Sequence, residues 1–149
     1  MDNFLLNRYG DSLYFESNVL NLRAHWWSSL AEINLNQEDE HLRPSYCIFV
    51  QNIPINIVIE NLRSKNKSIL VDKQLFHKHL QAPKVWRIIN HWQKEEKLIP
   101  PTITWSKLYD SIEIEDGRHR LNTAMCLGEN SIPVLVPKDN LEKIFRFLK

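Results

Sequence analysis

One short run of the chain combines acidic side chains, a glycine and basic side chains, and such a combination could bind an anion. The run consists of Glu115, Asp116, Gly117, Arg118, His119 and Arg120. Backbone N–H groups beside a glycine can approach a ligand closely, and guanidinium groups match the oxygens of a phosphate. The residue types therefore predict phosphate binding over Gly117 to Arg120. Alternatively, the two carboxylates neutralise the arginines and Gly117 only permits a turn.

The residues on either side of this run predict the elements that position it. Ile112 and Ile114 alternate with acidic residues, as in a half-buried strand. Apolar residues then recur at helical spacing, Gly128 follows where a left-handed C-terminal cap is expected, and residues 132–136 form an apolar strand. The first turn of the helix would carry basic residues against the positive end of the helix dipole. Each would cost about a few tenths of a kcal/mol unless an anion is bound.

The run from Ile112 to Val136, IEIEDGRHRLNTAMCLGENSIPVLV, preceded by LIPPTITW, resembles the ParB/sulfiredoxin-like superfamily. In that superfamily a strand ends in a short motif of glycine, histidine and arginine that opens a helix and holds nucleotide phosphates. The resemblance implies that Gly117, His119 and Arg120 are the phosphate-cradle positions. Arg118 stands where sulfiredoxins have their reactive cysteine, so reduction of sulfinic acids is not expected.

The resemblance implies a mixed sheet with helices, an α+β fold, and it covers only part of the chain. It extends over about the last 55 to 65 residues, which is expected when the similarity is confined to one supersecondary unit. The length of 149 residues predicts a single domain over 1–149. Within it, the resemblance implies a ParB/sulfiredoxin-like core at 84–137 and leaves 1–80 unmatched.

Phosphate binding next to carboxylates suggests phosphoryl chemistry. Glu115 or Asp116 could hold Mg²⁺, because this cation is usually bound by one or two carboxylates together with phosphate oxygens. His119 could act as an acid or base near neutral pH, or it could orient the turn through a backbone hydrogen bond. The leading prediction is a nucleotide-binding protein of plasmid or phage type that uses ATP or CTP with Mg²⁺.

Two other functions remain open at this point. Plasmid fertility-inhibition factors, which are similar to this family, are described with ATPase and DNase activity, so the same site could cut DNA. The net charge of only +1 argues against tight DNA binding. Otherwise the protein is a non-enzymatic inhibitor or interaction module that binds a protein partner through its N-terminal half. The chain lacks room for the helix-turn-helix and dimerisation parts of a partition protein.

Composition and charge place the protein in a broad class. A hydrophobic content of 43% and 25% charged residues indicate an ordinary globular domain. No apolar run reaches the length of a membrane span and the N-terminus is acidic, so a cytoplasmic location without a membrane partner is expected. Residues 1–40 carry a local charge of −5 and residues 61–107 one of +7. This separation allows a basic face, or mutual neutralisation of the two segments, which we favour slightly.

Periodicity predicts the remaining elements. Cys47 and Cys126 lie in apolar contexts and are expected to be buried hydrophobes. The histidines at 77, 79 and 91 have no carboxylate or cysteine at metal-ligand spacing, so no metal is expected there. Asp139 and Glu142 suggest a capping box for a last helix, and Pro133 suggests an edge position or a strand start. The expected elements are helices over 22–35, 73–80 and 84–97 and strands over 46–50, 55–59, 69–71 and 102–105.

Overall fold

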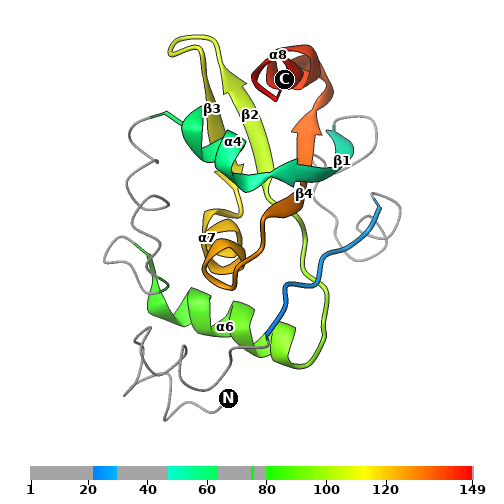
Figure 1. The fold of residues 1–149 in the computed structure, drawn as a ribbon, viewed down its shortest axis with the longest axis vertical. Helices are drawn as coiled ribbons and strands as arrows, with labels where there is room; N and C mark the ends of the chain where they lie inside the picture. The colour runs from blue at the N-terminus through cyan, green and yellow to red at the C-terminus, as the bar shows by residue number, and fades with distance from the viewer. Residues whose placement is uncertain (1–21, 30–46, 64–74, 76–79, 149) are drawn as a thin grey trace.

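The computed structural model describes residues 22–29, 47–63, 75 and 80–148, and these form a four-stranded mixed sheet with helices (Figure 1). The strand order is β1-β4-β2-β3, with β1 and β3 at the edges. β1 is antiparallel to β4 and β2 is antiparallel to β3, whereas β2 and β4 are parallel. The predicted α+β class is therefore confirmed. The strands are β1 (Cys47–Pro54), β2 (Thr102–Ser106), β3 (Ser111–Asp116) and β4 (Ser131–Pro137).

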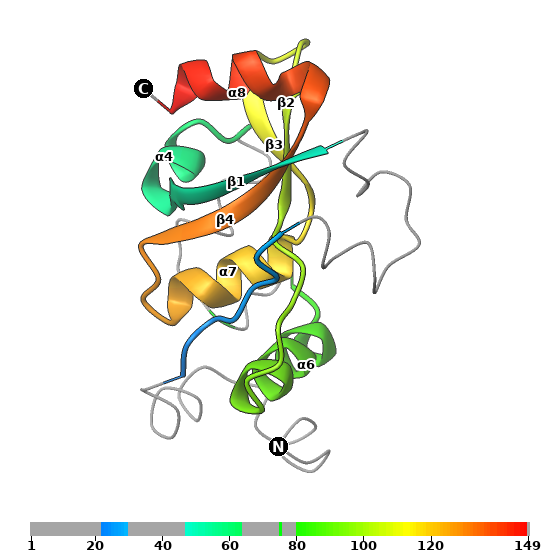
Figure 2. The same cartoon turned by 90° about the vertical axis from the view of Figure 1, so that its right-hand side faces the viewer.

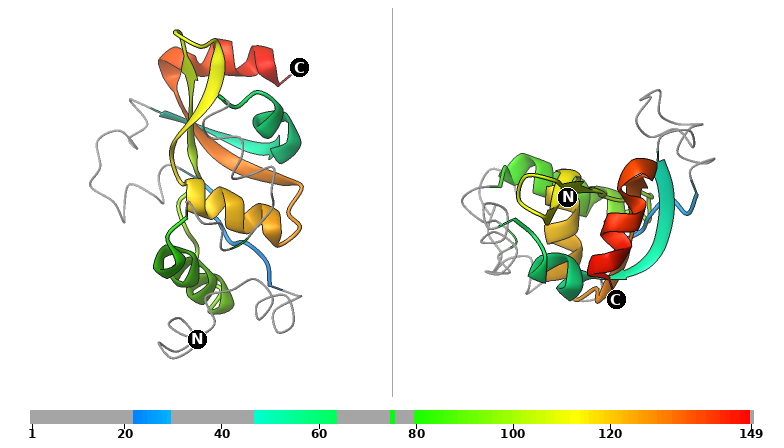
Figure 3. Two further views of the ribbon diagram at one scale, coloured as in Figure 1. Left: turned by 90° about the vertical axis from the view of Figure 1, so that its left-hand side faces the viewer. Right: turned by 90° about the horizontal axis from the view of Figure 1, so that it is seen from above.

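In the part of the chain that the structure describes, four helices contribute buried side chains to one core against this sheet. They are α4 (Ile55–Glu60), α6 (Ala82–Gln93), α7 (Arg118–Cys126) and α8 (Leu141–Phe147), the last preceded by a 3-10 turn at Lys138–Asn140. Figures 2 and 3 show α7 between the sheet and α6, with α8 at the opposite end of the molecule. No helix among the described residues is long and apolar enough to cross a membrane.

The predicted unit of strand, turn, helix and strand near the C-terminus is confirmed. β3 ends at Asp116, α7 begins at Arg118, and β4 returns from Ser131. Gly128 has φ +92, the left-handed conformation expected just after the helix. The main core joins this unit to α4 and α8 through buried side chains that include Val58, Ile103, Ile112, Leu121, Val134 and Ile144.

The helix predicted over 22–35 is wrong for residues 22–29, and its remainder lies outside the described residues. This segment forms an isolated parallel bridge with Leu98, to which the Trp27 N–H donates a 3.0 Å hydrogen bond. An extended backbone also explains the adjacent tryptophans. Trp26 meets Trp92 edge to face, with ring centroids 5.2 Å apart, whereas Trp27 packs on a separate cluster around Cys47.

The strand predicted over 55–59 is also wrong, because these residues form α4. The alternating isoleucines suggested a strand, but the buried positions are Ile55, Val58 and Leu62, which have helical spacing. Burial against the core thus outweighs the strand preference of β-branched residues. The strand predicted over 69–71 and most of the helix predicted over 73–80 lie outside the described residues.

α6 confirms the predicted helix over 84–97 in type, although it spans Ala82–Gln93. Its predicted stripe of Val85, Ile88, Ile89 and Trp92 is buried. Glu95 adopts φ +60, so the chain leaves the helix earlier than the polar run of the sequence suggested.

Of two sequence predictions for the C-terminal part, one is confirmed. Pro133 is the third residue of β4 and precedes Leu135, the β4 residue that pairs with β2, so it lies near the strand start as predicted. It lies opposite the irregularity in β1 between Val50 and Ile53, where the ladder has no regular hydrogen-bond pair to lose. The capping box is absent, since α8 starts at Leu141 with no side-chain cap. The side chain of Asn140 instead accepts a 3.0 Å hydrogen bond from the N–H of Trp105.

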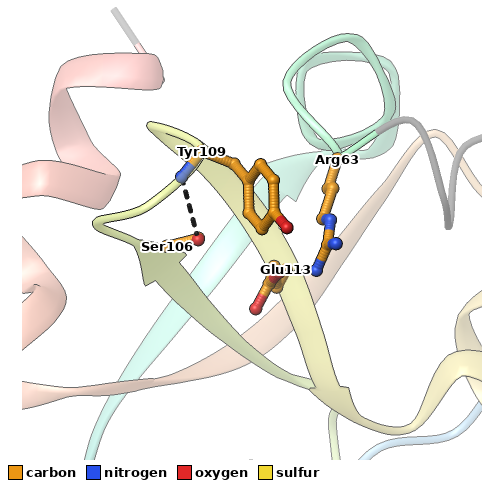
Figure 4. Close-up of polar contacts among 4 residues, drawn as sticks. All are labelled: Arg63, Ser106, Tyr109 and Glu113. Atoms are coloured by element: carbon orange, nitrogen blue, oxygen red, sulfur yellow. Dashed lines mark hydrogen bonds and ion pairs between the residues drawn. The ribbon is translucent and has the colours of Figure 1, made fainter.

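The hairpin of β2 and β3 is held on one side by Arg63, which follows α4 (Figure 4). Its guanidinium lies 3.7 Å from the ring centroid of Tyr109 and donates a 3.2 Å hydrogen bond to Glu113. The N–H of Tyr109 donates to the hydroxyl of Ser106 over 3.3 Å. These contacts connect the turn of the hairpin to the chain after α4.

Candidate functional site

An open cleft of about 320 Å³ lies between α6 and the start of α7. Its polar lining comes from both helices and from the end of β3. These side chains are Lys84, Arg87, His91, Asp116, His119 and Arg120. The turn predicted as a phosphate site therefore forms one wall of the cleft, and α6 forms the other.

Gly117 joins β3 to α7 and has φ +91, a conformation that other residues rarely adopt. A Cβ at this position would lie 2.8 Å from the Cα of Pro101 and 2.9 Å from Nη2 of Arg120. The glycine thus permits both the turn and the close packing of Pro101 against it. No side chain caps α7, and no acidic residue occupies its first turn.

Arg120 and Asp116 face each other in the cleft. Nη2 of Arg120 lies 3.5 Å from Oδ2 of Asp116, a long contact with a carboxylate whose side chain is 56% exposed. Nε of Arg120 is buried and has no hydrogen-bond partner among the residues that the structure describes. The guanidinium therefore keeps unused hydrogen-bonding capacity at the wall of the cleft.

His119 lies at the junction of the two helices. Its Nε2 accepts a hydrogen bond from the backbone N–H of Gln81, the residue before α6, over 3.1 Å. Burial, together with the positive charges of Lys84, Arg118 and Arg120, lowers the pKa of His119 to about 4. The imidazole is neutral at pH 7, and its Nε2 lone pair is already engaged.

The other two residues predicted for the site do not line the cleft. Arg118 is the first residue of α7 and acts on the site through its charge. Glu115 is exposed. Burial of the Cys47 thiol raises its pKa to about 11, and the negative charge of Glu115 adds to this shift. Of the two carboxylates predicted as possible ligands of a cation, Asp116 lines the cleft and Glu115 does not. The described residues contain no group of three or more His, Cys, Asp or Glu side chains that could hold a metal ion.

Lys84, Arg87 and His91 were not predicted as site residues from the sequence. All three lie on one face of α6, with the spacing i, i+3 and i+7 that places residues side by side on a helix. Nδ1 of His91 lies 2.7 Å from Oε2 of Glu96, so the carboxylate orients this imidazole. The spacing was visible in the sequence, but it did not indicate which element this face of α6 would meet.

The fold and the cleft define an α+β domain with a cationic site between one face of α6 and the N-terminus of α7. The chain matches no protein-family model, no curated protein and no solved structure. The ParB/sulfiredoxin-like resemblance stays a prediction.

Proposed function

We propose that the protein binds the phosphates of a nucleoside triphosphate, ATP or CTP, in the cleft between α6 and α7. The observation that carries this proposal is the convergence of Lys84, Arg87 and Arg120 on one cleft where Asp116 is the only carboxylate that the described residues contribute to the lining. Like charges repel one another, so such an arrangement is favourable mainly when an anion occupies it.

The helix ends add to this preference. The first N–H groups of a helix have no partner within the helix, and the dipole places partial positive charge there. α7 brings that end to the cleft without a capping side chain, and the Nε–H group of Arg120 lacks a partner among the described residues. Phosphate oxygens would accept hydrogen bonds from the helix N–H groups directly, and from the buried Nε–H group once the Arg120 side chain turns towards the cleft. The cleft volume of about 320 Å³ falls within the usual range of about 300 to 1,000 Å³ for ligand sites.

The proposal includes Mg²⁺-dependent hydrolysis of the bound nucleotide. Asp116 would supply the one protein carboxylate, and phosphate oxygens and water would supply the other ligands of the cation. His119 is a poor base, because its Nε2 already accepts a hydrogen bond and its pKa is about 4. His91 is the better candidate to take the proton of the attacking water, since Glu96 holds Nδ1 and leaves Nε2 for that role. The proposal includes the ParB/sulfiredoxin-like fold that the sequence resemblance implies.

Binding is tested by calorimetry with ATP, CTP, ADP and inorganic pyrophosphate. Arg120→Ala and Lys84→Ala should each weaken binding about tenfold or more, because a hydrogen bond to a charged group contributes about 1.5 to 3 kcal/mol. Arg146→Ala removes an exposed cation on α8 and should leave affinity unchanged. No binding by the wild-type protein, or wild-type affinity in both cleft variants, overturns the proposal.

Turnover is tested separately from binding. Asp116→Asn should abolish Mg²⁺-dependent phosphate release while strengthening binding in the absence of Mg²⁺, because it removes the negative charge from the cleft. His91→Gln should lose turnover and keep affinity. Wild-type rates in both variants would leave the protein as a nucleotide binder without this mechanism.

A further inference from the structure

We propose that His119 is a positioning residue, which ties the start of α6 to the start of α7 and does not itself bind the phosphate. Its geometry stands on the structure alone, whereas its functional meaning rests on the proposed phosphate binding. The cations of the cleft come from two separate helices, so their spacing depends on how these helices are held together. His119 supplies a polar contact at the end where the cations lie.

The hydrogen bond identifies which nitrogen is used. The backbone N–H of Gln81 is the donor, so Nε2 of His119 must be the unprotonated nitrogen and Nδ1 carries the proton. The same residue is anchored in α7, where its carbonyl accepts a 2.8 Å hydrogen bond from the hydroxyl of Thr123. A protonated imidazole could not accept from Gln81. The lowered pKa of His119 keeps it neutral at physiological pH.

Apolar packing also joins the helices, since Ile88 and Trp92 of α6 lie in the main buried core with Leu121 and Ala124 of α7. Trp86 and Ile89 of α6 belong to a buried cluster against which Cys126 and Leu127 pack, at the C-terminal end of α7. Figures 2 and 3 show the two helices next to each other. The contact of His119 with Gln81 thus adds a polar link, between the residue before α6 and the second residue of α7, to the apolar packing of the two helices.

Electrostatic repulsion acts against this junction. Lys84 on α6 and Arg120 on α7 both lower the pKa of His119, so both charges lie close to it from opposite walls. Like charges across the cleft favour its opening, and a neutral acceptor holds it closed without adding charge. Losing the acceptor should therefore move the two walls apart while the apolar cluster keeps the helices attached.

This role predicts a dependence on ligand size. Pyrophosphate can contact both walls at once, whereas orthophosphate can be held by the α7 wall alone. His119→Phe keeps a ring of similar size without an acceptor, and should weaken pyrophosphate binding about tenfold and orthophosphate binding less than about threefold. His119→Gln places an acceptor near the position of Nε2 and should restore most of the pyrophosphate affinity.

The experiment combines calorimetry of both anions with NMR hydrogen exchange at the Gln81 amide. In His119→Phe this amide should exchange faster, and in His119→Gln it should stay protected. If the two anions lose affinity equally in His119→Phe and Gln81 exchange is unchanged, His119 is a direct ligand and the inference is overturned. Wild-type affinity for pyrophosphate in His119→Phe overturns it too.

Two measurements on the wild-type protein test the role of His119 without relying on a variant, and distinguish its failure from failure of the proposed phosphate binding. In the wild-type protein, the ¹⁵N shift of Nε2 should be that of an unprotonated acceptor with and without pyrophosphate. A large change on adding pyrophosphate would identify a direct contact and refute the positioning role, even if His119→Phe fails to fold. If the wild-type protein binds neither anion, the phosphate cleft itself is refuted, and the role of His119 in it also.

Discussion

Replacing Gly117 by alanine tests whether the turn at the cleft is shaped by conformation alone or also by close packing. Gly128 offers a matched control, because both glycines have nearly the same φ, +91 and +92. A Cβ on Gly117 would lie 2.8 Å from the backbone Cα of Pro101, whereas a Cβ on Gly128 would meet nothing within 4 Å. Both substitutions therefore place an alanine in the left-handed conformation, but only Gly117→Ala also adds a close contact with Pro101.

The magnitudes follow from this comparison. An alanine in the left-handed region costs about 1 to 2 kcal/mol, and the smaller entropy of the unfolded alanine chain offsets part of this at both sites. Overpacking adds about 1 to 3 kcal/mol at Gly117, because Pro101 is backbone and cannot rotate away. With an offset of about 0.4 to 1 kcal/mol, Gly117→Ala should thus lower the free energy of unfolding by about 1 to 4.5 kcal/mol, and Gly128→Ala by at most about 1.5 kcal/mol.

Urea denaturation followed by tryptophan fluorescence and circular dichroism measures both variants. Similar m-values in the variants and the wild type would justify direct comparison of the free energies. Equal costs for the two substitutions, within about 0.5 kcal/mol, would refute the packing argument and leave only the left-handed conformation as the reason for Gly117.

Three further predictions concern pH, thiol reactivity and the hairpin. The pKa of His119 is about 4 in the folded protein, against 6.5 for the unperturbed group. Its contribution to stability is therefore present above pH 6.5 and is lost as the pH falls towards 4. Unfolding titrations should show about 1 to 2 kcal/mol lost over this range, and His119→Phe should remove that part of the slope. Cys47 is 1% exposed and its pKa is raised to about 11, so a thiol reagent at pH 8 should label it only on unfolding, and rapid labelling of the native protein would contradict its burial. Arg63→Ala should lower the free energy of unfolding by about 0.5 to 1.5 kcal/mol through loss of its contacts with Tyr109 and Glu113, and Arg63→Lys should recover only part; no change in either variant would show that these contacts do not stabilise the hairpin.

Local patterns predicted the C-terminal unit well. The alternation before Asp116, the helical spacing after Gly117 and the glycine at 128 each depend on neighbours within one or two turns of chain. Backbone preferences and periodicity act at this range, so one sequence is enough to place them. The buried stripe of α6 was predictable for the same reason.

Patterns failed where burial by distant residues decided the structure. Residues 55–59 have the alternation of a strand, but the core accepts Ile55 and Val58 from a helix. Residues 22–29 have apolar positions at helical spacing, but Trp27 and Leu98, far apart in sequence, pair their backbones instead. These contacts join residues whose proximity no local periodicity encodes.

The candidate site shows the same division. The sequence by itself determined the glycine turn and a basic helix start at Arg118 to Arg120, because residue type and spacing specify both. Only the tertiary structure decided that Lys84 and Arg87 of α6 join Arg120 in one cleft, and that Asp116 lines it while Glu115 does not. It also decided that the Nε2 lone pair of His119 is used for Gln81, 38 positions away in the chain. The physical reason is that the chemistry of a side chain depends on its neighbours in space, and packing of the helices and the sheet selects those neighbours.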